Sequence, residues 1–428
     1  VVMIEGAWDG NTWIWDGASW RLAFKGPWRR YKESGLGTED FLPAGFSPEQ
    51  EAFLPVGHPG WDPISRTVVI VGKKLSGDAR ALYSWNGSGW DHLGPPPTMD
   101  SFQLLYDHSG ERLLATGVVL DSLGMFTLAS EIHQWNGTTW TRVGRVTHPV
   151  GPVPFLEPLW ARWSWYMDPP GGLVVLHPDL MEDQFGLWTA EGYDPRAITD
   201  VADGTYPGHG REPGLVDAPG EGGVLRYAGE TWYWLGEDPY DLNIPTLDTT
   251  WRWDGVDWAP HHAIDDAGSN LELFPREGFA STWDRARNSV LLHGGLYQDP
   301  NNVFGLTIGR DAWSFADGTW TLLDALASTP YEEAPVRIHA RLASLPDTGQ
   351  TILFGGSPLM GTLDTGFTEQ PNDTWAWDGQ GWQNVLTVDP EGDGDPSGRK
   401  GHAMAYHPPS GRVLLYGGAV HDPTCVPT

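Results

Sequence analysis

The sequence predicts an all-β protein, a β-propeller of four-stranded antiparallel blades. The first observation is a phrase that returns along the chain: a short aromatic strand, an Asp-Gly or Asn-Gly turn, and a second strand that opens on Trp. This combination is the strongest short-range signal for a β-hairpin. The last three copies recur at an interval of 62 residues, at Trp251, Trp313 and Trp375. A recurrence of this length indicates an array of β units, because one such unit cannot bury its apolar face alone.

The hairpin phrase supplies two strands of each unit. Its copies are TWIWDGASW (12–20), YSWNGSGW (83–90), HQWNGTTW (133–140), TWRWDGVDW (250–258), AWSFADGTW (312–320) and TWAWDGQGW (374–382), with a reduced copy, LWTAEGY, at 187–193. Because these Trp residues repeat with the fold, we expect them to pack between neighbouring blades. Asn86 and Asn136 lie in sequons, but we expect each to be required in its turn for a positive φ.

A second phrase precedes each hairpin and supplies the other two strands. It is a strand, a tight turn and an apolar strand that ends in Gly, and its clearest copies span 278–295, 339–356 and 401–418. The apolar strands show no polar alternation, which is typical of a strand buried on both faces between neighbouring sheets. His339 and His402 fall at nearly equivalent positions in this phrase, so we expect them to be structural rather than metal ligands.

The two phrases together resemble the kelch repeat, in the style of bacterial kelch proteins. Paired glycines end the apolar strands at 294–295, 355–356 and 417–418, and Trp258, Trp320 and Trp382 stand in the place of the closing Trp of the repeat. The resemblance implies a β-propeller over nearly the whole chain. It departs in the middle, where a long insertion lies between Gly229 and Thr249.

The count of phrases leaves the number of blades open. Seven hairpins and seven first strands predict seven blades in one domain, residues 1–428, with a ring closed by pairing of the N- and C-terminal segments and a tail at 419–428. Both VVMIEG at the start and RVLLYGG near the end fit a second strand. Eight blades is therefore the alternative, and the chain is then a piece of a longer protein.

Composition excludes several classes of partner. The formal net charge is −30, from 56 acidic and 26 basic residues. Such a field repels nucleic acid and anionic lipid, so we expect neither nucleic-acid binding nor membrane insertion. Strong acidity keeps a Trp-rich surface soluble, which favours a secreted or cell-surface protein. The single cysteine, Cys425, is either an unpaired thiol in the tail or paired outside this sequence.

Long connections are expected at one end of the blades. The first-to-second and third-to-fourth strand turns are tight, and they alternate with long connections at 25–50, 118–130, 144–159, 296–310, 324–336, 357–372 and 386–400. In an up-and-down blade these connections all leave from one face. Recognition concentrates in long loops on a rigid scaffold, so this face is the predicted binding face.

One loop could hold a metal ion. Asp389, Asp393 and Asp395 lie within seven residues, with Gly392 and Gly394 between them to permit sharp turns. Several oxygens could therefore converge on Ca²⁺, although the spacing is not that of an EF-hand. A merely solvated acidic loop is the alternative, and calcium is the only cofactor the sequence suggests.

Two pairs of Trp residues outside the hairpin phrase are candidate ligand-stacking positions. Trp163 and Trp165 share one face of a strand, as do Trp232 and Trp234. Indoles beside carboxylates are what sugar-stacking sites use, and packing in the core or insertion is the alternative. No catalytic residue can be named.

These observations predict a non-catalytic, secreted or surface-exposed scaffold that binds a protein or glycan through the long-connection face. One alternative is a polysaccharide-active hydrolase or lyase that uses acidic residues on that face, which requires a buried carboxyl of raised pKa beside an exposed Trp. Another is a structural subunit of a larger extracellular assembly.

Overall fold

The fold is given by a computed structural model that describes much of the chain as β-structure. The described residues are 7–9, 11–26, 28–31, 38–41, 53–74, 79–99, 101–107, 111–120, 128–148, 165–167, 173–177, 184–189, 192–197, 214–227, 250–253, 258–261, 273, 276–298, 306–323, 335–358, 370–385, 387, 392, 394–407 and 410–420. They fall in two compact units, one of Val1–Met3 with Ala44–Thr199 and the other of Ile4–Pro43 with Asp200–Thr428.

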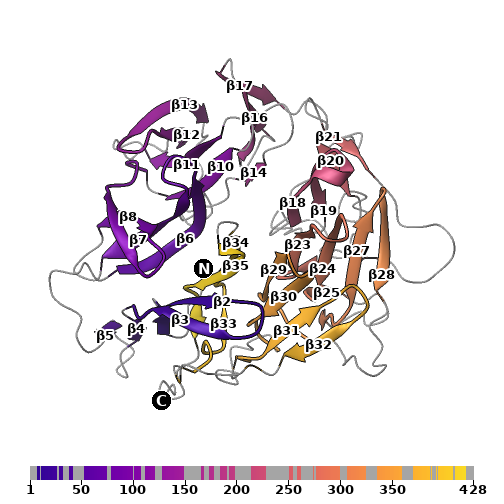
Figure 1. The fold of residues 1–428 in the computed structure, drawn as a ribbon. Helices are drawn as coiled ribbons and strands as arrows, with labels where there is room; N and C mark the ends of the chain where they lie inside the picture. Colours follow the sequence, from indigo (N-terminus) through magenta and orange to yellow (C-terminus); the bar gives the residue numbers. More distant parts are fainter. Residues whose placement is uncertain are drawn as a thin grey trace. The chain divides into compact units, whose positions relative to one another are not determined.

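The first unit contains three four-stranded antiparallel blades (Figure 1). Blade 1 consists of β6 (Phe53–Asp62), β7 (Thr67–Lys74), β8 (Arg80–Trp85) and β9 (Trp90–Gly94). Blade 2 consists of β10 (Ser101–Asp107), β11 (Arg112–Leu120), β12 (Leu128–Trp135) and β13 (Trp140–His148). Blade 3 consists of β14 (Trp165–Met167), β15 (Leu173–His177), β16 (Gln184–Thr189) and β17 (Gly192–Ala197). The reduced hairpin at 187–193 therefore forms, with Trp188 opposite Tyr193.

The second unit contains three more blades of the same topology (Figure 1). Blade 4 consists of β18 (Gly214–Ala218), β19 (Gly223–Tyr227), β20 (Trp251–Trp253) and β21 (Trp258–Pro260), with the 3-10 turn η2 (Pro219–Glu221) between its first two strands. Blade 5 consists of β23 (Ala280–Asp284), β24 (Ser289–His293), β27 (Ala312–Ala316) and β28 (Thr319–Leu323). Blade 6 consists of β29 (Arg341–Leu345), β30 (Gln350–Phe354), β31 (Thr374–Trp377) and β32 (Trp382–Val385).

Both ends of the chain share one further sheet in the second unit. Its order is β3 (Trp20–Phe24), β2 (Thr12–Trp15), β35 (Arg412–Tyr416) and β34 (Ala403–His407), and β2 pairs with β35 from Thr12 opposite Tyr416 to Trp15 opposite Val413. We call it the terminal sheet. The segment VVMIEG lies outside the described residues.

The expected count of seven or eight blades is corrected by this arrangement. Six blades are each built from one continuous stretch of chain. The hairpin at 12–20, counted from the sequence toward a seventh blade, lies in the terminal sheet. Its first strand, β2, pairs with β35, and β35 pairs with β34, so the other two strands of this sheet come from the other end of the chain. The fold class, an all-β propeller, is confirmed.

In the second unit, two further sheets form at the ends of the blades from which the long connections start. In blade 5, β22 (Arg276–Glu277), β25 (Leu296–Gln298) and β26 (Leu306–Ile308) form a three-stranded sheet. Beside the terminal sheet, β33 (Arg399–Lys400), β36 (Ala419–Val420), β1 (Ala7–Asp9), β4 (Trp28–Tyr31) and β5 (Thr38–Phe41) form a five-stranded sheet. In blade 6 the same place holds an isolated bridge between Ile338 and Ser357.

Apolar clusters between successive sheets form the core. One cluster joins blade 4 to blade 5, another joins blade 5 to blade 6, and a third joins blade 6 to the terminal sheet. In the first unit a fourth cluster joins blade 1 to blade 2. The second strands are buried along their length, as expected for strands covered on both faces.

The Trp residues of the hairpin phrase lie mainly in these clusters, as predicted. Trp15, Trp251 and Trp382 are among the largest fully buried side chains. Two indoles also form hydrogen bonds between sheets: Trp320 Nε1 donates to Thr250 Oγ1 at 2.6 Å, and Trp20 Nε1 donates to Thr374 Oγ1 at 2.8 Å. The fourth strand of one sheet is thereby held to the third strand of the sheet before it.

The hairpin turns differ from the expected two-residue type. In four of them the strand-ending aromatic faces the opening Trp across a four-residue loop, and the side-chain Oδ1 of the first loop residue accepts two backbone N–H groups. The residues that accept are Asp16, Asn86, Asn136 and Asp378. The expectation that Asn86 and Asn136 adopt positive φ is wrong, because the following glycines, Gly87 and Gly137, adopt it instead. Asn is used here as a hydrogen-bond acceptor.

Blade 5 lacks this local acceptor and receives one from blade 4. Its turn is a two-residue turn in which Asp317 and Gly318 both have positive φ, and Ala316 stands where the other turns carry Asp or Asn. The buried Glu221 of η2 accepts the backbone N–H of Asp317 at 2.6 Å and of Gly318 at 3.2 Å, and it contacts His261 Nε2 at 2.9 Å. The carboxylate therefore ties two blades together.

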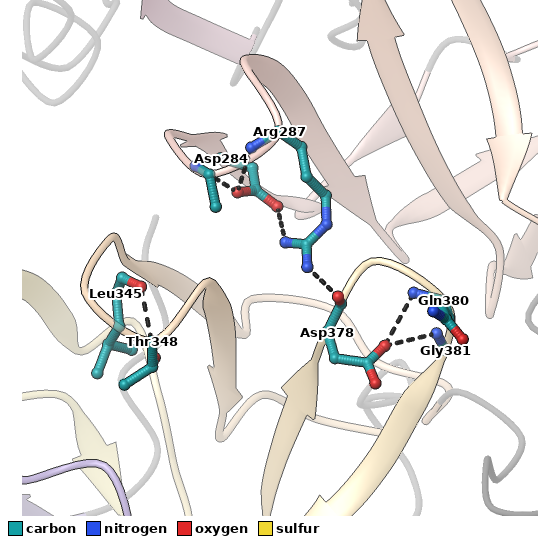
Figure 2. Close-up of polar contacts among 8 residues, drawn as sticks. Asp284, Arg287, Leu345, Thr348, Asp378, Gln380 and Gly381 are labelled. Atoms are coloured by element: carbon teal, nitrogen blue, oxygen red, sulfur yellow. Dashed lines mark hydrogen bonds and ion pairs between the residues drawn. The ribbon is translucent and has the colours of Figure 1, made fainter.

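Between blades 5 and 6, the first turn of blade 5 is likewise bound to the hairpin turn of blade 6 (Figure 2). Asp284, at the end of β23, pairs with Arg287 at 2.6 Å, and the other guanidinium nitrogen of Arg287 donates to the backbone oxygen of Asp378. In the first unit, Ile64 of blade 1 lies beside Gly137 of blade 2. In these three pairs of blades, the first turn of one blade thus contacts the hairpin turn of the next.

We predict that Glu221→Gln lowers the free energy of unfolding by about 1 to 3 kcal/mol, because an amide cannot satisfy two N–H donors and His261 as a carboxylate does. Urea unfolding at neutral pH measures this. Asp378→Asn is the matched control, and we expect it to change stability by less than about 0.5 kcal/mol because Asn86 and Asn136 already serve in the same position. Equal losses in both variants would contradict the inter-blade role of Glu221.

Burial of a histidine makes the blade 5–blade 6 interface sensitive to acid. His293, at the end of β24, is fully buried, its Nε2 contacts the oxygen of Pro335 at 2.8 Å, and its ring lies 5.0 Å from that of Trp382. Desolvation lowers the pKa of His293 from 6.5 to about 4, despite the hydrogen bond to Pro335, which raises it. Between these pH values the unfolded chain binds a proton that the folded chain does not.

We therefore predict that stability falls as the pH drops from 6.5 toward 4, and that His293 accounts for about 3 kcal/mol of this fall. His293→Phe is the test, since Phe354 fills the equivalent position in blade 6. The variant should lose the matching share of the pH dependence in urea unfolding measured at pH 7 and at pH 4. An unchanged pH dependence would contradict the assignment.

Candidate functional site

The bases of the long connections are held by buried arginines. Arg276, Arg337 and Arg399 precede the first strands of blade 5, blade 6 and the terminal sheet, and each is at most 4% exposed. Each donates from one guanidinium nitrogen to the carbonyl of the first glycine of its own Gly pair, 18 residues later, at 2.8 to 3.0 Å. The three residues are therefore equivalent parts of the repeat.

Two of these arginines form ion pairs with a carboxylate at the start of the third strand. Arg276 binds Asp311 through two hydrogen bonds of 2.9 Å each, and Arg337 binds both oxygens of Asp373 at 2.5 Å. The indole two residues later in each strand donates to the same carboxylate. Burial acts to raise the pKa of Asp311, but the hydrogen bonds and charge of Arg276 outweigh it, so the pKa is lowered. The carboxylate of Asp311 is thus held ionised.

The Gly pairs join one blade to the next at this end. In blade 5, Gly295 N donates to the carbonyl of Arg337 at 3.1 Å, and in blade 6, Gly356 N donates to the carbonyl of Arg399 at 2.8 Å. A Cβ on Gly294 would lie 2.5 Å from the Arg337 oxygen, and one on Gly355 would lie 2.4 Å from that of Arg399. Both glycines also have positive φ. Only glycine allows this approach, which explains the Gly pairs.

The terminal sheet and blade 2 vary the arrangement. In the terminal sheet, Asn11 stands where blades 5 and 6 carry Asp, and its Oδ1 accepts the N–H of Gly26 at 3.0 Å. In blade 2 the acid is Glu131, two residues before His133, and it is bound by Arg142 and Arg145 of β13. Glu131 lies opposite Gly117, just as Asp311 lies beside Gly294.

The predicted calcium loop is only partly described. Asp389 and Asp393 lie outside the described residues. Asp395 is half-buried and accepts a hydrogen bond from Thr387 Oγ1, while Gly392 and Gly394 have the positive φ expected of sharp turns. Among the described residues, no group of three or more His, Cys, Asp or Glu side chains could hold a metal ion.

The predicted stacking residues also lie largely beyond the described part of the chain. Trp163, Trp232 and Trp234 lie outside it, and Trp165 is placed by its backbone alone, in β14 opposite Leu176. His339 and His402, expected to be structural, are offset by one residue in the repeat. His339 takes the positive-φ position of Gly278 and Gly401, and His402 is fully buried.

Sequence reasoning missed the arginine–carboxylate anchors. Their signal is present in the repeat: Arg276, Arg337 and Arg399 recur at nearly the interval of the hairpins, and an acid precedes the third-strand aromatic by two residues in blades 2, 5 and 6. The two phrases were defined by their apolar, aromatic and Gly positions, and these polar positions lie outside that definition.

Comparisons with known proteins give no family. No protein-family model matches the chain, and no curated protein matches it. The kelch resemblance therefore stays a prediction. Among the residues the structure describes, no helix has the length and apolar character needed to cross a membrane.

Several solved propeller and enzyme structures are similar at low identity. An α-L-arabinofuranosidase from Fusarium graminearum, in complex with an iminosugar inhibitor, is 12% identical with a TM-score of 0.38, covering 73% of this chain and 89% of its own. An acylaminoacyl peptidase is 12% identical with a TM-score of 0.42, covering 92% of this chain and 56% of its own. The β-propeller domain of the Trilobed protease from Pyrococcus furiosus is 8% identical with a TM-score of 0.39, covering 90% of this chain and 95% of its own.

We predict that Arg337→Ala lowers the free energy of unfolding by about 3 to 5 kcal/mol, because it leaves Asp373 and the Gly355 carbonyl without their partner. The double variant Arg337→Met with Asp373→Asn should lose clearly less, since no buried charge remains unpaired. Urea unfolding compares the two. A single variant no less stable than the double variant would contradict the role of the ion pair as an anchor.

Proposed function

We propose that the chain is a non-catalytic binding scaffold, of kelch-like repeat type, that engages a protein or glycan partner through the long connections of its blades. The observation that carries this proposal is the contrast between the two ends of the blades. At one end the tight turns of successive blades are tied to one another by Glu221 and Arg287. At the other end the long connections start from buried, ion-paired bases.

A rigid base is what a binding loop requires. Ordering a loop costs conformational entropy at the moment of binding, and a loop whose two ends are already fixed loses less. Arg337 binds Asp373 at the far end of the connection that leaves blade 6 after Gly355 and Gly356, so the two ends of that connection are held together. The same holds in blade 5 through Arg276 and Asp311.

Three of the described carboxyls favour a binding role over hydrolysis. A glycosidase of the usual type needs a general acid whose pKa is raised. For Asp16, Glu131 and Asp311, burial acts to raise the pKa, but hydrogen bonds and nearby positive charges outweigh it, so the pKa of each is lowered.

The composition adds a secreted or cell-surface location to the proposal, because a net charge of −30 favours solubility and cationic or neutral partners.

Replacement of residues 359–369 in blade 6 tests the proposal. A Gly/Ser linker of equal length removes the side chains and leaves the Arg337–Asp373 base intact. Binding is measured to a microarray of defined glycans and to a displayed peptide library. We expect the wild-type chain to select specific members, and the linker variant to lose at least some of them.

The matched control changes the other end of the same blade. Its turn at 378–381 is replaced by the sequence of residues 86–89, which forms the same four-residue loop in blade 1. This variant should bind as the wild type does. Loss of binding in the turn variant, with retention in the linker variant, would place the binding face at the opposite end.

A further inference from the structure

Blade 2 differs from blades 5 and 6 in the position of the arginines that bind its carboxylate. In blades 5 and 6 the carboxylate is bound by one buried arginine, and the side chains of Arg276 and Arg337 are 1% and 4% exposed. In blade 2, Met99 stands three residues before Phe102, where blade 5 carries Arg276 three residues before Phe279. The acid of blade 2 is instead bound by two arginines of the outermost strand.

The geometry of this cluster is set by a β-bulge. Ile132 lies opposite Gly144 and His133 lies opposite Arg142, so Val143 is an extra residue in β13. Arg142 and Arg145 are three residues apart and would face opposite sides of a regular strand. The bulge turns both to the side of Glu131 and His133, and bulges commonly re-aim side chains in this way.

One buried carboxylate holds three partners. Arg142 and Arg145 each donate to Glu131 Oε1 at 3.0 Å, and His133 Nε2 contacts Oε2 at 2.8 Å. The side chain of Glu131 is 6% exposed, whereas those of Arg142 and Arg145 are 53% and 43% exposed. The carboxylate is therefore enclosed by its partners, while both guanidinium groups reach solvent.

The cluster carries excess positive charge in a strongly acidic chain. Two guanidinium groups share one carboxylate, which leaves one positive charge even with His133 neutral. A guanidinium has five N–H donors in a planar fork, and the bond to Glu131 uses one from each. Because both groups are bound to the same oxygen, they are held side by side, as the two halves of a receptor for an oxyanion.

We propose that Arg142 and Arg145, positioned by the buried Glu131, form an oxyanion-binding site that takes a carboxylate in preference to the more highly charged phosphate. A guanidinium fork fits either group, so the preference rests on charge. The net charge of the chain disfavours polyanions at long range, so the site suits a single anionic group carried on a ligand. The site lies in β12 and β13 and does not require that the long connections bind a partner.

Titration with sodium D-glucuronate tests the site, with D-glucose as the neutral match and inorganic phosphate as the tetrahedral anion. Saturation-transfer-difference NMR follows the sugars, and broadening of the phosphorus resonance follows phosphate, at constant ionic strength. We expect saturable binding of glucuronate, weaker binding of phosphate and none of glucose. Arg142→Gln and Arg145→Gln should each weaken glucuronate binding at least about tenfold.

Two further variants keep the test decisive. Arg66→Gln removes an equal charge from an exposed turn of the same unit and should leave binding unchanged. Arg145→Lys retains the charge and loses the fork, so it should weaken glucuronate binding while the protein stays folded by circular dichroism. No binding of either anion, or equal weakening by Arg66→Gln, would overturn the proposal. Phosphate bound more tightly than glucuronate would overturn the carboxylate preference.

Discussion

Burial of an apolar second strand between two neighbouring sheets is the constraint on which the rest of the structure depends. Leu291, Ile352 and Leu414 each lie at the centre of a strand that is covered on both faces. Such a strand cannot be buried by its own blade alone, so each blade requires the next. The terminal sheet obeys the same constraint, because Trp13 and Trp15 from the start of the chain pack in one cluster with Val413 and Leu415 from its end.

Polar bonds at the two ends of the blades supplement this apolar packing in different ways. At the tight-turn end, side chains bridge directly from one blade to the next, as Glu221 does to the turn at Asp317. At the long-connection end, the bridge is a backbone bond from a glycine to the carbonyl of the next arginine, while the arginine side chain stays within its own blade. The second design fixes where a connection starts and finishes without constraining its middle. Variation of that middle therefore leaves the scaffold intact, which suits a binding surface.

Much of the fold could be predicted from the sequence because hairpins and buried strands leave local signals. The alternation of TWAWDGQGW with TILFGG predicts which strands pair and which of them is buried, and both outcomes hold. The blade count could not be predicted, because VVMIEG and RVLLYGG both fit a second strand and no local pattern decides which one pairs with Thr12–Trp15. The turn type was mistaken for a related reason. Two residues lie between Asp378-Gly379 and Trp382, whereas one lies between Asp317-Gly318 and Trp320, and the Asp-Gly signature is the same in both.

The candidate site was less predictable than the fold. A bulge at Val143 brings Arg142 and Arg145 to one face, and bulges leave little trace in a single sequence. The buried arginines were hidden for another reason. An isolated Arg before a predicted strand is ordinary surface composition, and only its pairing with a carboxylate about 35 residues later, as between Arg276 and Asp311, makes it a core residue.

Amide hydrogen exchange measured by mass spectrometry would test most directly the claim that rigid bases support the long connections. The account predicts that the amides of Gly295 and Gly356, which donate to the Arg337 and Arg399 carbonyls, exchange as slowly as those of the second strands beside them. Exchange at these two glycines as fast as in the exposed turn at 86–89 would contradict it, because the connections would then leave from a base that opens as readily as the surface.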